Sequence, residues 1–197
     1  MNYPEYVEID GQRFKINTDF RVALKCNKIA QDDTIQDYER ALAIIYLLFG
    51  EVVFEKTEYQ EKFLELAQKY LSCGKEIKPT NEEPDFDFEQ DMELVRISFI
   101  SDYGGLDIKN TTMHFWEFMD RINGLSNSEM GNCCILNRVR NLRNFNTKNI
   151  KDPKEKKKII EAKKQVALKK KEKKRILTEE EKNNINDFMK MAGIERE

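Results

Sequence analysis

Apolar and polar residues alternate at the start of the chain and then change to a helical period. The stretch Tyr6–Ile16 alternates on both sides of Asp10-Gly11, a dipeptide typical of a tight β-hairpin turn. From Thr18 onward, apolar residues recur every three or four positions, and Thr18 or Asp19 can cap the first helix. A lone hairpin is marginally stable in water, so we expect it to lie against the helices that follow.

Further segments with helical periodicity follow before residue 146. One begins at a cap in residues 32–34 and ends at Gly50; its second half is apolar almost all round, which predicts a central core helix. A loop with two prolines, residues 78–85, is the clearest break in the chain. The remaining helices are expected at about 57–72, 88–103 and 112–122, and from Ser126 or Ser128 to about Leu142.

Beyond Asn146 the chain becomes rich in lysine and poor in apolar residues. Asp152-Pro153 is a favoured helix opening, with aspartate as the cap and proline at the first helical position. Thr178 and Glu181 have the spacing of a capping box, which predicts a short last helix. The C-terminal segment is therefore expected to be helical and strongly basic.

Together these patterns predict a mainly α fold. An N-terminal β-hairpin would pack on a bundle of about six helices in residues 1–146, and a Lys-rich helical segment would form residues 147–197. The longest apolar run, residues 41–49, is less than half of the about 20 residues that a membrane helix needs, so we expect no membrane span. The first ten residues carry three acids and no apolar core, which argues against a secretory signal.

The net charge of −2 conceals a strong segregation of charge. Residues 1–137 hold 14 basic and 26 acidic side chains, whereas residues 138–175 hold 17 and 4. Such a basic stretch can be a solvated helix, bind an acidic protein partner, or bind nucleic acid nonspecifically. Nucleic acid is the least favoured of the three, because lysines dominate and interleaved aromatics are nearly absent. The candidate partner-binding lysines are Lys156, Lys157, Lys163 and Lys164.

The residues that carry chemistry form no familiar active-site motif. No glycine-rich phosphate loop, HExxH or GxSxG is present. The single histidine, His114, lies in an aromatic helix, where a packed or surface role is favoured over catalysis. Acid pairs at 32–33 and at 85 and 87 could bind a metal, but carboxylates are also favourable at helix N-termini. We therefore expect no enzymatic activity, no metal and no cofactor.

The four cysteines point to a reducing compartment. Two of them are adjacent and none has the CxxC spacing of a structural zinc site. Small buried thiols are therefore favoured over metal ligands.

The aromatic helix has two possible interpretations. Phe115, Trp116, Phe118 and Met119 cannot all face one direction at 100° per residue. In one interpretation, one face of this helix packs into the core and the other face contacts neighbouring helices. In the other interpretation, an exposed aromatic face contacts another protein or a second copy of the chain. These four residues complete the set of candidate partner-binding residues.

Several stretches, taken in order, resemble a family of phage proteins. Their specificity lies in their number and order, because they are helix-packing patterns rather than chemical motifs. The likeness covers most of the chain and extends through the Lys-rich helix. It is carried by Phe14–Arg21, Glu39–Glu51, Phe99–Gly104, His114–Phe118, Gly124–Arg140 and Ile150–Pro153. In these stretches the chain resembles the bacteriophage gene-product-fifteen family of Gram-positive siphophages, which is encoded near the major tail protein and tape-measure genes.

The resemblance implies a tail assembly chaperone in the host bacterial cytoplasm. Such a protein would bind and solubilise the tape-measure protein during tail assembly, with many copies on one partner. It implies homo-oligomers, and contact with the major tail protein is a further expectation. Two other functions stay open: a permanent structural subunit of the tail or adaptor, and nonspecific nucleic-acid binding through the basic segment.

Overall fold

Helices dominate the structure, a computed structural model that describes residues 3–76, 83–127 and 133–169. The expected fold class, an N-terminal hairpin followed by a mainly helical body and a basic helix, is confirmed. None of the helices in these ranges combines the length and the apolar run needed to cross a membrane. The elements are β1 (Tyr6–Ile9), β2 (Gln12–Lys15), α1 (Phe20–Ala30), α2 (Asp37–Phe49), α3 (Val52–Glu55), the 3₁₀ turn η1 (Thr57–Tyr59), α4 (Gln60–Leu71), α5 (Phe88–Asp102), α6 (Phe115–Asn123), α7 (Ile135–Asn144), the 3₁₀ turn η2 (Thr147–Asn149) and α8 (Pro153–Val166).

The hairpin forms as its turn sequence predicts and packs on the helices. Asp10 and Gly11 adopt φ angles of 50° and 78°, the left-handed conformation that a two-residue turn requires. Phe14 on β2 is buried, with its ring edge-on to Phe63 of α4 at 5.0 Å between centroids. Lys62 Nζ lies 2.7 Å from the Asp10 carboxylate, which ties the turn to the same helix.

Several helix starts lie later than the sequence expectation. α4 begins at Gln60, after η1, and α6 begins at Phe115, each about three residues later than expected. Residues 32–35 form a turn in which Asp32 accepts hydrogen bonds from the backbone and hydroxyl of Thr34, so α2 begins only at Asp37. The helix expected from Ser126 or Ser128 begins at Ile135, with Cys134 as its N-cap, and the Asn137 side chain donates to the carbonyls of Leu125 and Ser126.

Some expectations fall on residues outside the described ranges. They are the middle of the proline loop, the segment at 128–132 and the last helix with its capping box at Thr178. The sequence patterns did not predict the short helix α3. The boundary between residues 1–146 and 147–197 stays a prediction.

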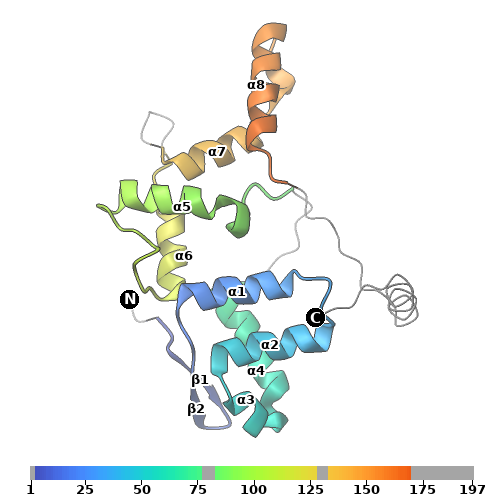
Figure 1. The fold of residues 1–197 in the computed structure, drawn as a ribbon, viewed down its shortest axis with the longest axis vertical. Helices are drawn as coiled ribbons and strands as arrows, with labels where there is room; N and C mark the ends of the chain where they lie inside the picture. The colour runs from blue at the N-terminus through green and yellow to red at the C-terminus, as the bar shows by residue number, and fades with distance from the viewer. Residues whose placement is uncertain (1–2, 77–82, 128–132, 170–197) are drawn as a thin grey trace, which may run out of the picture.

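Aromatic rings from three helices form the centre of the core. Phe118 of α6 stacks on Phe20 of α1 with 4.4 Å between ring centroids, and it lies 5.6 Å from Phe99 of α5. All three rings are buried, and burying each stabilises the fold by about 1.5–3 kcal/mol. In Figure 1, α6 lies between α5 and α1, and so joins the end of the molecule that holds the hairpin and α2–α4 to the end that holds α7 and α8.

Truncation of Phe118 should therefore destabilise the whole fold. We expect Phe118→Ala to lower the free energy of unfolding by about 3–5 kcal/mol in urea denaturation, because it removes a ring from the meeting point of three helices. Ile97→Ala on α5 is the control, since Ile97 is 44% exposed and should cost within about 0.5 kcal/mol. Equal losses for the two variants would contradict this description of the core.

The four thiols should differ in reactivity. Cys26 is buried, and burial raises the pKa of its thiol to about 12, whereas Cys73 and Cys133 are partly exposed. We expect an alkylating reagent at about pH 8 to modify Cys73 and Cys133 in the native protein, and Cys26 only after unfolding. Mass spectrometry of the peptides would measure the order, with the denatured protein as the control in which all four react. Rapid labelling of native Cys26 would contradict the prediction.

Candidate functional site

The aromatic helix α6 is built into the fold, which corrects one of its two interpretations. Phe115 and Phe118 are 1% and 0% exposed, so neither belongs to a contact surface. Trp116 stacks on Tyr70 of α4 and donates its indole N–H to the Tyr70 carbonyl at 2.9 Å. Met119 is partly buried against the core. The helix has core on one side and neighbour contacts on the other, so Phe115 and Phe118 form no exposed aromatic face. Partner binding through the partly buried Trp116 and Met119 stays a prediction.

The four candidate lysines lie on α8, but they do not share one site. Figure 1 shows α8 beyond α7 at one end of the molecule, and no residue of α8 is buried. Lys163 and Lys164 line a groove beside the helix, whereas Lys156 and Lys157 lie outside it. The structure therefore separates the lysines into two pairs, and it places neither pair beside the α6 aromatics.

The groove lies between α8 and the segment that leads into α5. Its volume is about 1210 Å³, above the range of about 300–1,000 Å³ that is common for small-molecule pockets, so it suits a peptide segment. The chemistry of its lining is mixed. Apolar contacts come from Pro84, Phe86, Ile160, Ala167 and Leu168, carboxylates from Glu83, Asp85 and Asp87, and ammonium groups from Lys163, Lys164 and Lys169.

A buried ion pair holds the groove together. The guanidinium of Arg143 on α7 makes two hydrogen bonds, of 2.7 and 2.8 Å, to the carboxylate of Asp91 on α5. These side chains are only 11% and 2% exposed. Arg143 also donates to the carbonyl of Asp85 at 2.8 Å and to the carbonyl of Val166 at 2.7 Å. One side chain thus joins α5, the segment before it and the end of α8.

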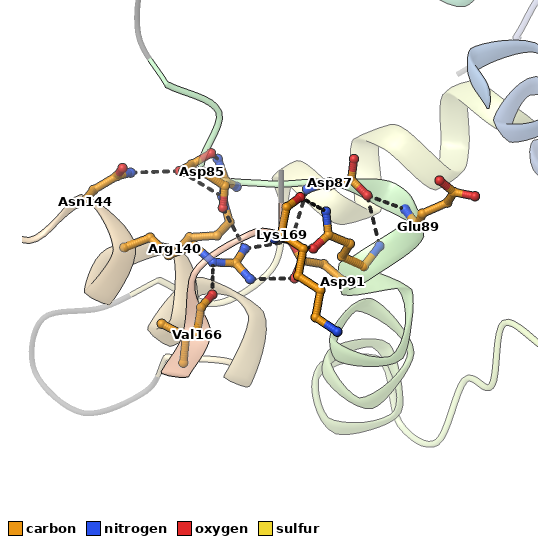
Figure 2. Close-up of polar contacts among 10 residues, drawn as sticks. Asp85, Asp87, Glu89, Asp91, Arg140, Asn144, Val166 and Lys169 are labelled. Carbon is orange, nitrogen blue, oxygen red and sulfur yellow. Dashed lines mark hydrogen bonds and ion pairs between the residues drawn. The ribbon is translucent and has the colours of Figure 1, made fainter. Parts of the chain in front are cut away.

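Further contacts reinforce both walls of the groove. Asp85 accepts hydrogen bonds from Arg140 and Asn144 (Figure 2), and these outweigh the effect of burial, so that the pKa of Asp85 lies below its usual value. The side-chain amide of Gln90 pairs with the backbone of Lys169, donating to its carbonyl at 3.1 Å and accepting from its N–H at 2.7 Å. The chain beyond α8 is therefore docked as far as residue 169.

Other chemistry-bearing side chains serve the fold. His114 caps α6 by accepting from the Trp116 N–H, and its other ring nitrogen lies 3.0 Å from the Pro4 carbonyl. Asp87 caps α5, and Asp33 pairs with Arg40. Within the described ranges, no group of three or more His, Cys, Asp or Glu side chains could hold a metal ion.

Sequence reasoning missed the residues that build this site. The sequence does contain one sign of the site. Asp91 lies four residues before Val95, on the side of α5 that is buried, and a buried carboxylate needs a partner of opposite charge. Its partner could not be identified, since Arg143 is 52 residues away and is one of several arginines in α7.

Comparison with known proteins gives one match. The family model described as Bacteriophage Gp15 protein matches residues 2–168 of the chain, which includes every residue of the groove up to Leu168. Searches of curated proteins and of solved structures found no match.

Loss of Arg143 should be far more damaging than loss of its neighbour Arg140. We expect Arg143→Met to lower the free energy of unfolding by about 3–5 kcal/mol, because it leaves the Asp91 carboxylate buried without a counter-charge. Arg140→Met should cost about 1 kcal/mol or less, since its pair with Asp85 is partly exposed.

The double variant Arg143→Met/Asp91→Leu tests the physical cause. Removing both charges should recover most of the lost stability in urea denaturation. A double variant as unstable as Arg143→Met alone would mean that the charge of Asp91 is not the source of the loss.

Proposed function

The chain belongs to the bacteriophage Gp15 protein family, and from that premise we propose that it is a tail assembly chaperone that binds and solubilises the tape-measure protein. Its role would be to mask apolar helical stretches of that long partner until the tail subunits replace them. This work needs a binding surface and no catalytic group.

The groove beside α8 is the observation that carries the proposal. An α-helix with its side chains is about 10–12 Å across, and amphipathic helices bind in grooves through their apolar face. Here the apolar face of a partner helix would contact Phe86, Ile160 and Leu168. Acidic residues on its flank would meet Lys163, Lys164 and Lys169. Many such weak contacts along one partner would add up through multivalency.

Co-expression with the tape-measure protein of the same phage tests this function. We expect a soluble complex with several copies of this chain per partner, measured by size exclusion with light scattering. Ile160→Asp should weaken the apparent affinity at least about tenfold, because it places a charge among the apolar residues that line the groove.

Ile97→Asp is the matched control, since Ile97 is also an exposed helical isoleucine but does not line the groove. A charge-reversal pair extends the test: Lys163→Glu/Lys164→Glu should weaken the complex, and Lys69→Glu/Lys75→Glu should not. If the partner precipitates while this chain elutes alone, the proposal is wrong. Detection of the chain in purified particles at fixed stoichiometry would then favour a structural subunit of the tail.

A further inference from the structure

The outer face of α8 carries positive charge that the rest of the described chain does not neutralise. Nine basic residues of the body form ion pairs with carboxylates, whereas none of the six lysines of α8 does so within the described residues. Lys154, Lys157 and Lys158 are exposed at helical spacing, and none of them lines the groove. Glu161 is exposed on the same side, so this side of the helix keeps an excess of positive charge. These three lysines, the outer face of α8, are free for another partner.

A surface of the opposite charge lies at α3. Residues 32–65 hold nine acidic and three basic side chains. Glu51, Glu55 and Glu58 are exposed and form no ion pair in the described part of the chain. Beside them, the rings of Tyr46 and Phe54 are 40% and 48% exposed and lie 5.5 Å apart. We call Tyr46, Glu51, Phe54, Glu55 and Glu58 the α3 patch.

The two surfaces lie far apart in one molecule. Figure 1 shows α8 at one end of the longest axis and α3 at the other. Arg143 and Gln90 hold the end of α8 in place through Val166 and Lys169. The lysines of α8 therefore cannot reach the α3 patch of their own copy, while those of a second copy can.

We propose that copies of this chain associate head to tail, with the outer face of α8 of one copy on the α3 patch of the next. Ammonium groups pair with carboxylates and are also attracted to aromatic faces, so the α3 patch offers lysine both kinds of partner. The two surfaces lie at opposite ends of the molecule, so copies that all point the same way each keep one surface unoccupied. The contact then builds an open row or a ring, whereas an antiparallel pair would stop at a dimer. The proposal does not depend on the tape-measure protein.

Light scattering of the full chain alone tests the association. At low ionic strength the average mass should rise with protein concentration beyond that of a dimer. At about 1 M salt, where the Debye length is about 3 Å, the mass should return to that of the monomer. A monomer at every concentration at low ionic strength would overturn the proposal.

Two variants identify the surfaces. Lys154→Gln/Lys157→Gln/Lys158→Gln removes the outer charges of α8, and Glu51→Gln/Glu55→Gln/Glu58→Gln removes those of the α3 patch. Each variant alone should stay monomeric. Mixed together they retain one intact surface of each kind, so they should form a 1:1 complex and nothing larger. A mixture without a complex, or variants that assemble like the original chain, would overturn the proposal.

Controls separate this association from the other properties of the protein. Lys69→Gln/Lys75→Gln should assemble like the original chain, since these exposed lysines belong to neither surface. Unfolding in urea at the original midpoint shows that a monomeric variant is folded. Ile160→Asp, which tests the groove, should leave the row intact, so failure of tape-measure binding and failure of self-association are distinct results.

Discussion

The carboxylate of Asp91 on α5 is buried and needs a counter-charge, and the guanidinium of Arg143 on α7 supplies it. The pair with Asp91 is nearly inaccessible to water, so neither charge is tolerable without the other. Arg143 donates two further hydrogen bonds to the carbonyls of Asp85 and Val166, which brings the segment before α5 and the end of α8 to the same point. Arg143 thus helps to set both the groove and the direction of α8, together with the contact of Gln90 with Lys169.

The position of α8 gives one basic helix two different surfaces. Its groove side presents Lys163 and Lys164 near apolar lining residues, and its outer side presents mainly lysines, with Glu161 among them. The first arrangement suits an amphipathic helix, and the second suits a carboxylate-rich surface. A row of copies would repeat the groove at regular intervals, as the proposed binding of many copies to one long partner requires.

Local signals in the sequence predicted the local features well. Asp10-Gly11 encodes the hairpin turn and Asp152-Pro153 the start of α8, because in each case adjacent residues determine the backbone. The site could not be predicted in this way. Lys163 and Lys157 are equivalent in the sequence, and only the docking of α8 through Arg143 and Gln90 decides which of them faces the groove. In the aromatic run of α6, Phe118 failed as a surface signal because three helices meet on it.

The His114 cap has a consequence for how the chain folds during synthesis. His114 contacts the Pro4 carbonyl, and the backbone N–H groups of Phe20 and Phe115 bond to the carbonyls of Met113 and Thr18. These contacts at the start of α1 can form only after residues more than 90 positions later have been made, several seconds at usual rates of translation. The hairpin can close early, but the stack of Phe20 on Phe118 forms only once α6 is present.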